Sequence, residues 1–187
     1  MTSRFSKGGI LINRKKKLSF KFNGKNLFGF YGDTLASALL ANNQVLIGRS
    51  FKYHRPRGFV SSGVEEPNAL LSIGSGGSLE PNRSATTLEL FDGIEAMSQN
   101  HFGSLEWDIG SISNFLSKIF PAGFYYKTFI KPRFAWKHIF EPTIRSAAGL
   151  GKAPKEHDLS SYDYFYAHLD VVIVGGGISG LVTAKNL

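Results

Sequence analysis

The feature that most constrains this chain is a glycine motif near its C-terminus, preceded by an apolar run. The run, Val171 to Val174, leads into Gly175-x-Gly177-x-x-Gly180, and a segment of helix-like composition follows. This order of strand, turn and helix is typical of the βα turn that binds a dinucleotide. Gly175 would permit the tight turn, Gly177 would let the backbone approach a pyrophosphate, and Gly180 would let the helix pack closely on the strand. The helix would direct its unpaired N–H groups at the phosphates.

The residues predicted to bind the dinucleotide are the motif glycines and two neighbours: Gly175, Gly176, Gly177, Ser179 and Gly180. A glycine-rich turn without a ligand is the alternative, because the chain has 21 glycines and short spacings arise by chance. A βαβ unit needs roughly 30 residues, and its ribose-binding acid follows the glycines by roughly 20. Because the sequence given ends at Leu187, we expect only the start of a Rossmann domain, in which NAD and FAD cannot be told apart.

The formal charge of +8 invites a nucleic-acid interpretation, but this charge is unevenly distributed. Of the 22 basic residues, eight precede the first acidic residue, Asp33, and the rest are balanced by the 14 acidic residues. An excess confined to one terminal arm is more often solvated or docked on an acidic partner than used to read nucleic acid. We therefore expect no nucleic-acid partner.

The chain contains no cysteine, which removes disulfides, thiolate metal sites and any iron–sulfur cluster held by cysteine sulfur. Its five histidines show no close pair at metal-ligand spacing, so no metal site is predicted. Near the N-terminus the longest apolar run is Ile10 to Ile12, too short for a signal peptide or a membrane span. We expect a soluble cytoplasmic protein that does not contact a membrane.

A β-hairpin followed by a helix is predicted in the first third of the chain. Leu18 to Phe22 alternates apolar and polar residues, and Asn23-Gly24 is a preferred two-residue hairpin turn. The alternation resumes at Phe28 and Phe30. Next, Asp33 and Thr34 offer capping side chains before apolar residues at helical spacing, and Asn42-Asn43 ends the pattern.

Further short strands are predicted at Val45 to Ile47, Ala69 to Ile73 and Thr86 to Leu90. Hairpin, helix and later strands are the element order of a β-grasp domain of the ferredoxin or ubiquitin type. The predicted fold class is α+β: a ferredoxin-like β-grasp domain, an aromatic-rich connector, and the first strand, turn and helix of a truncated Rossmann α/β domain.

The segment Gly48 to Gly58 interleaves four cations with aromatic residues. One interpretation is an anion or nucleic-acid loop, since aromatic rings can stack while cations meet phosphates. The interpretation we favour is structural, with Arg55 and Arg57 paired to Glu65 and Glu66, because arginine pairs carboxylates bidentately.

From Asp92 to Ser160 the chain is rich in aromatic residues and is interrupted by Pro121, Pro132 and Pro142. So many aromatic side chains are unusual for a flexible linker, and the prolines break any long helix. Short helices that pack over a neighbouring domain would account for both features. Such aromatic residues more often form an interface or a core than a cofactor site.

Several long blocks give the chain a family resemblance. Besides the glycine motif, these blocks are Gly32-Asp-Thr-Leu-Ala-Ser-Ala-Leu-Leu-Ala41, Gly48-Arg-Ser-Phe-Lys-Tyr-His-Arg-Pro-Arg-Gly58 and Glu65-Glu-Pro-Asn-Ala69. On these residues the chain resembles the N-terminal part of the alpha subunits of heterotetrameric sarcosine oxidases. The middle blocks are long and unusual, so they are more specific than the glycines alone.

The resemblance implies a subunit that acts with beta, gamma and delta subunits. The implied reaction is oxidation of sarcosine to glycine, with hydrogen peroxide formed and the one-carbon unit passed to tetrahydrofolate. Implied cofactors are NAD on the alpha subunit, and FAD and FMN in the assembled complex. Related dehydrogenase subunits carry a [2Fe–2S] cluster through cysteines on a similar domain, and the absence of cysteine here predicts no iron–sulfur cluster.

No catalytic residue can be named from the sequence, although His54 and His101 are candidates. The expected domains are a basic arm (1–14), a cluster-free ferredoxin-like domain (15–92), a connector (93–167) and the start of the Rossmann domain (168–187). A non-catalytic β-grasp module that binds partner subunits is the alternative, as is a subunit of a related amine or opine dehydrogenase.

Overall fold

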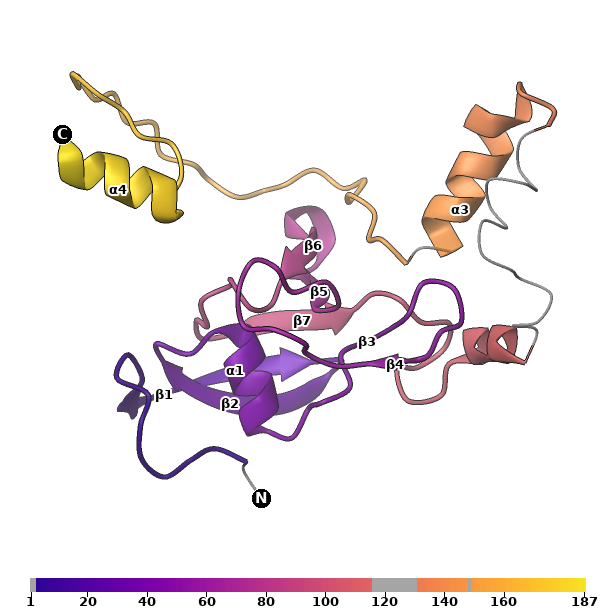
Figure 1. The fold of residues 1–187 in the computed structure, drawn as a ribbon, viewed down its shortest axis with the longest axis horizontal. Coiled ribbons are helices and arrows are strands. Elements are labelled where there is room, and N and C mark those ends of the chain that lie inside the picture. Colours follow the sequence, from indigo (N-terminus) through magenta and orange to yellow (C-terminus); the bar gives the residue numbers. More distant parts are fainter. Residues whose placement is uncertain (1–2, 116–130, 148) are drawn as a thin grey trace.

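The computed structural model of the chain describes residues 3–115, 131–147 and 149–187 (Figure 1). Its best-formed part is a five-stranded sheet with one helix packed on it (Figure 1). The α+β expectation is confirmed at this level, because the architecture is a mixed sheet with few helices, as in ferredoxin-like domains.

The predicted hairpin is present as β1 (Asn13–Phe22) and β2 (Lys25–Tyr31), paired antiparallel. Its two turn residues both have positive φ, 47° at Asn23 and 78° at Gly24. This is the backbone of a type I′ turn, which Asn-Gly favours because both residues tolerate left-handed conformations. The Asn23 carboxamide also bonds Ser98, so the turn is fixed to a strand that is remote in sequence.

The predicted helix is α1 (Leu35–Ala41), and it begins with a reciprocal cap. The Thr34 hydroxyl accepts from the Ser37 N–H, and the Ser37 hydroxyl accepts from the Thr34 N–H. The helix ends at Asn42, before Asn43 in a left-handed conformation with φ 58°. Polar capping at both ends explains why seven residues stay helical at this position.

The later strands differ from the prediction. β5 (Leu70–Ile73) is where it was expected, but Val45 to Ile47 is not a strand, and Thr86 to Leu90 is a turn with one isolated bridge. The other strands of the main sheet are β6 (Glu80–Ser84) and β7 (Ile94–Ser98). A separate pair consists of β3 (Gly48–Arg49) and β4 (Pro56–Arg57).

The strand order of the main sheet is β2-β1-β7-β5-β6. β7 pairs parallel with β1 and antiparallel with β5, so it lies in the middle of the sheet. The expected domain boundary at residue 92 is therefore too early, because β7 had been assigned to the connector.

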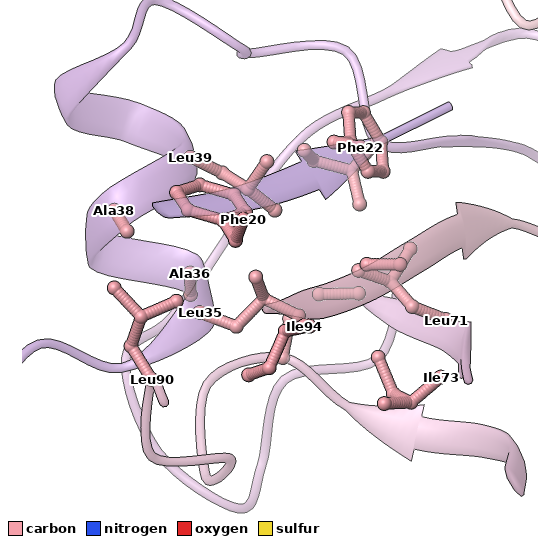
Figure 2. Close-up of a cluster of buried hydrophobic side chains, with 14 of the residues drawn as sticks. Phe20, Phe22, Leu35, Ala36, Ala38, Leu39, Leu71, Ile73, Leu90 and Ile94 are labelled. Atoms are coloured by element: carbon pink, nitrogen blue, oxygen red, sulfur yellow. The ribbon is translucent and has the colours of Figure 1, made fainter. Parts of the chain in front are cut away.

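The core lies between α1 and the sheet (Figure 2). Leu35 and Leu39 are fully buried, and they point from α1 towards Phe20 of β1 and Ile94 of β7 (Figure 2). Alternate residues are buried in β1 from Leu18 onward and along all of β7, as expected for strands with one face on the core. Burial of these apolar side chains is the main stabilising contribution to the domain.

Beyond β7 the described residues form short helices. They are the 3₁₀ segment η2 (Ile109–Asn114), the π-helical turn η3 (Trp136–Phe140) and α3 (Glu141–Ala147). Another 3₁₀ segment, η1 (Gly76–Ser78), lies between β5 and β6. Trp107, Phe115 and Phe134 are exposed. The predicted aromatic residues between 116 and 130 lie outside the described part of the chain.

Residues 149–158 return to the edge of the sheet. The Gly151 N–H donates to the Asn82 side chain of β6 over 2.9 Å. A Cβ on Gly77 would lie 2.1 Å from the His157 carbonyl oxygen, so backbone packs against backbone at η1. This part of the connector therefore covers the β6 edge, which reduces its availability for pairing with another chain.

Candidate functional site

The glycine motif forms a turn that leads into α4 (Ile178–Asn186). Gly175 has φ +113°, a conformation that residues with a side chain rarely adopt. Gly177 precedes the helix in an extended conformation, and its carbonyl accepts the first helical hydrogen bond, from Leu181, over 3.0 Å. Gly175 therefore has a backbone conformation that favours glycine, and Gly177 stands directly before the first turn of α4.

The predicted site residues differ in how much space surrounds them. A Cβ added at Gly175, Gly176 or Gly177 would meet nothing within 4 Å, whereas at Gly180 it would lie 2.1 Å from the Gly175 carbonyl oxygen. Gly180 is thus needed for the helix to approach the turn, and Gly177 leaves open space where a phosphate could come close. Ser179 is exposed in the first turn of α4.

The strand predicted before this turn is not formed. Val171, Val172 and Val174 are exposed, and residues 171–174 belong to no strand of either sheet. Figure 1 shows α4 with no strand beside it. A parallel strand is stable only between neighbouring strands and beneath helices, and the described residues supply neither at this position.

The loop between β3 and β4 is held by Arg49, whose side chain is nearly buried. Its guanidinium donates to the carbonyl oxygens of Leu105 (2.6 and 2.9 Å), Glu106 (2.8 Å) and His54 (3.3 Å). It also lies 4.0 Å from the Asp108 carboxylate. Arg49 therefore joins this loop to residues 105–108.

Asp108 and His54 complete a buried cluster with Arg49. The His54 Nδ1 lies 2.6 Å from the Asp108 carboxylate, and the His54 ring stacks on Phe102 with centroids 5.2 Å apart. The other Asp108 oxygen accepts the N–H groups of Phe102 (2.8 Å) and Gly110 (2.9 Å). Burial raises the pKa of Asp108, but these hydrogen bonds outweigh burial and hold its pKa below the ordinary value.

The predicted pairing of Arg55 and Arg57 with Glu65 and Glu66 is wrong. Arg55 donates to the Asn114 side chain over 3.0 Å, and Arg57 has no hydrogen bond or ion pair from its side chain to any described residue. The Glu66 carboxylate accepts backbone N–H groups instead, from Val60 and Ser61 at 2.7 Å and from Asn68 at 2.8 Å. The contacts that join this loop to the rest of the domain come from Arg49 and His54 instead.

Glu66→Gln should lower the free energy of unfolding by about 1–3 kcal/mol at neutral pH, because three N–H groups lose a charged acceptor. Burial raises the pKa of Glu66, but its backbone hydrogen bonds outweigh burial and lower the pKa below the ordinary value. A carboxylate with a lowered native pKa stabilises the fold above its unfolded pKa of about 4.3, and this contribution disappears as the pH falls through the native value.

Urea unfolding of wild type and Glu66→Gln at several pH values measures this difference. It should be largest near pH 7 and shrink below about pH 4. Glu65→Gln, at an exposed neighbour, is the matched control and should change stability little at any pH. A difference between wild type and Glu66→Gln that is the same at pH 7 and pH 3 would contradict the assignment.

The two candidate histidines have structural contacts. His54 belongs to the buried cluster, and His101 Nε2 lies 2.9 Å from the Ser98 hydroxyl, which also bonds Asn23. Within the part of the chain that the structure describes, no three His, Asp or Glu side chains gather as a possible metal site. No described residue is therefore assigned a catalytic role.

Comparison with known proteins gives a family match for the sheet domain. Residues 15–101 match a family described as "2Fe-2S iron-sulfur cluster binding domain". The matched range contains all five strands of the main sheet apart from the first two residues of β1. No iron–sulfur cluster was expected from the sequence, and this match to a cluster-binding family contradicts that expectation. This chain has no cysteine to supply a thiolate ligand, so its residues do not fit a cluster held by cysteine sulfur.

Longer relatives identify the protein family more closely. The chain is 53% identical over 174 residues to sarcosine oxidase subunit alpha of Rhizobium meliloti (strain 1021). The aligned region covers 93% of this chain and 18% of that protein. The chain is 32% identical over 181 residues to the same subunit of Corynebacterium sp. (strain U-96), covering 95% of this chain and 14% of that protein. The resemblance to sarcosine oxidase alpha subunits is confirmed, and the chain spans less than a fifth of their length.

Among solved structures, the chain matches L-proline dehydrogenase from P. horikoshii, with 28% identity over 46% of this chain and 16% of that chain. The TM-score is 0.35, which is too low to establish a shared fold. Among the described residues, no helix combines the length and the apolar character needed to cross a membrane.

Proposed function

We propose that this chain is the N-terminal part of the alpha subunit of a sarcosine oxidase complex containing flavin and NAD. The observation that carries the proposal is the 53% identity to a sarcosine oxidase alpha subunit over 93% of the chain. The complex would oxidise sarcosine to glycine, reduce oxygen to hydrogen peroxide and pass the one-carbon unit to tetrahydrofolate. Its other subunits would be beta, gamma and delta.

The proposed role of residues 168–187 is to begin a dinucleotide-binding domain. Gly175, Gly176, Gly177, Ser179 and Gly180 would surround the pyrophosphate. The positive φ of Gly175, the close approach of Gly180 to it and the open space at Gly177 support this proposal. The first N–H groups of α4 would donate to phosphate oxygens, and the positive end of the helix dipole would favour their charge.

The proposed role of the sheet domain is structural. Its candidate histidines are used in internal contacts, and its loops are joined by the Arg49, His54 and Asp108 cluster. The domain would therefore present a rigid surface to other parts of the complex.

Gly177→Ala in the purified complex should weaken NAD binding by about tenfold or more, which corresponds to about 1.4 kcal/mol. The new methyl group would occupy the space that the pyrophosphate needs. The variant should still fold, because Gly177 has an ordinary extended backbone and its Cβ would meet nothing within 4 Å. Isothermal titration calorimetry with NAD measures the affinity, and thermal unfolding checks the fold.

Lys185→Ala, at an exposed position in the last turn of α4, is the control and should bind NAD like wild type. Gly180→Ala should disturb the turn itself, because its Cβ would meet the Gly175 carbonyl oxygen at 2.1 Å. Equal NAD affinity in wild type and Gly177→Ala would contradict the proposed role of the glycine turn. A purified complex without sarcosine oxidase activity would contradict the proposed enzymatic function.

A further inference from the structure

A pocket of about 290 Å³ lies beside the β3–β4 loop, away from the glycine turn. One wall is formed by β3 and the residues that follow it, and others come from residues 67–70 and 99–100. Gly149 and Leu150 form the side contributed by the chain beyond α3. The pocket thus combines four stretches that are distant in sequence, two of which belong to the Gly48–Gly58 and Glu65–Ala69 blocks.

The charged side chains that line this pocket, among the described residues, are both positive. They are Arg49 and Arg57, and no described aspartate or glutamate lines it. The Arg49 guanidinium is already bonded to three carbonyl oxygens, but the exposed Arg57 side chain makes no hydrogen bond or ion pair with any described residue. Arg57 can therefore offer its planar pair of N–H donors to a ligand.

Further donors lie on the same pocket. The Ser50 hydroxyl accepts the Arg55 N–H at 2.9 Å, so its own hydrogen is available to a ligand. The Asn68 side chain also lines the pocket. Phe51, Leu70 and Leu150 supply apolar surface. The pocket therefore offers both polar groups and apolar surface, a combination found in sites for small organic molecules.

The side made by residues 149–150 is held firmly in position. Gly149 has φ +67°, and a Cβ there would lie 2.0 Å from the Asn100 side-chain oxygen. The Asn100 amide in turn donates to the Arg49 carbonyl oxygen at 2.6 Å. The neighbouring Gly151 is bonded to Asn82. These contacts connect the pocket walls to one another before any ligand binds, which lowers the entropic cost of binding.

We propose that this pocket binds a small organic anion, with its carboxylate or phosphate group at Arg57 and its apolar part against Phe51, Leu70 and Leu150. The volume is at the lower end of the range for small-molecule sites, roughly 300–1,000 Å³, so a whole dinucleotide does not fit. The site is thus separate from the glycine turn, and it does not depend on the function proposed above.

The test is a titration of the 187-residue chain followed by ¹H–¹⁵N NMR, with butyrate and phenyl phosphate as probes at constant ionic strength. We expect saturable shifts of the backbone amides of Asn68, Asn100 and Gly149 with at least one probe. The probe that binds more tightly identifies the anionic group. Arg57→Met should weaken binding about tenfold or more, because a hydrogen-bonded charge is removed. Arg57→Lys, which keeps the charge but loses the planar donor pair, should be intermediate.

Lys155→Met is the control, since it removes one positive charge from an exposed position outside the pocket. It should leave both affinities unchanged. Thermal unfolding should be the same for all three variants, because both residues are exposed. The proposal is overturned if neither probe gives saturable shifts, or if Arg57→Met and Lys155→Met weaken binding equally.

Discussion

Leu39→Ala should lower the free energy of unfolding of the sheet domain by about 2–5 kcal/mol, a large part of the roughly 5–15 kcal/mol typical of a domain. Leu39 is fully buried, and it points from α1 towards the sheet (Figure 2). Truncation removes apolar contacts and leaves a cavity. The capped helix and the paired strands around it can move only a little to fill that cavity.

The next residue of the same helix supplies a matched control. Leu40 is 39% exposed, so Leu40→Ala removes the same atoms but should cost less than about 1 kcal/mol. Helix propensity changes equally in the two variants, and the difference between them therefore measures burial. Urea unfolding followed by circular dichroism gives both values. Similar losses for the two variants would mean that α1 does not pack on the sheet as described.

Local signals were enough to predict the first part of the fold. The hairpin depends on Asn23-Gly24 and on alternation in the flanking strands, and the helix depends on Thr34 and Ser37 at its start. Each of these signals acts within a few residues, where backbone preferences and capping hydrogen bonds decide the structure. These elements therefore appear where the sequence placed them.

The rest of the sheet depends on contacts between distant residues. β6 has the polar sequence Glu-Pro-Asn-Arg-Ser, which lacks the apolar alternation of a strand, and it lies at the sheet edge. β7 alternates buried and exposed residues, but it is stabilised by parallel pairing with β1, where Phe20 lies opposite Ile94. No short-range pattern reveals that partner.

The candidate sites show the same limit. The glycine turn was predicted because positive φ and close backbone approach select glycine locally, as at Gly175 and Gly180. The Arg49, His54 and Asp108 cluster was missed because Asp108 is 54 residues from His54. The only signal for Asp108 was local, an aspartate that bonds the N–H of Gly110 two residues on, as in an Asx turn.

Glu66 illustrates why closeness in sequence misled the prediction of ion pairs. Glu66 follows Arg55 and Arg57 closely, but its carboxylate is fully used by three backbone N–H groups of its own loop. Buried N–H groups need acceptors, and leaving them unsatisfied costs more than an exposed ion pair contributes. Arg55 bonds Asn114 instead, and Arg57 lines the pocket beside the β3–β4 loop.

Asp108→Ala should destabilise the chain by about 3–5 kcal/mol, because it removes one partner from a buried charged cluster. The Asp108 side chain is fully buried, and it accepts from His54 and from the N–H groups of Phe102 and Gly110. Its loss leaves these groups without an acceptor and leaves the nearby Arg49 guanidinium without a compensating charge.

The control is Asp92→Ala, which removes an aspartate that also bonds a backbone N–H, that of Ser19, but lies on the surface. Its cost should be about 1 kcal/mol, since water can replace the lost acceptor. Urea unfolding compares the two variants, and hydrogen exchange locates the effect. Exchange in Asp108→Ala should rise first between residues 48 and 58 and between 101 and 110, because contacts of Arg49, His54 and Asp108 join these segments. An equal rise of exchange in β1 and β7 would contradict this assignment. It would mean that the cluster does not connect residues 48–58 to residues 101–110.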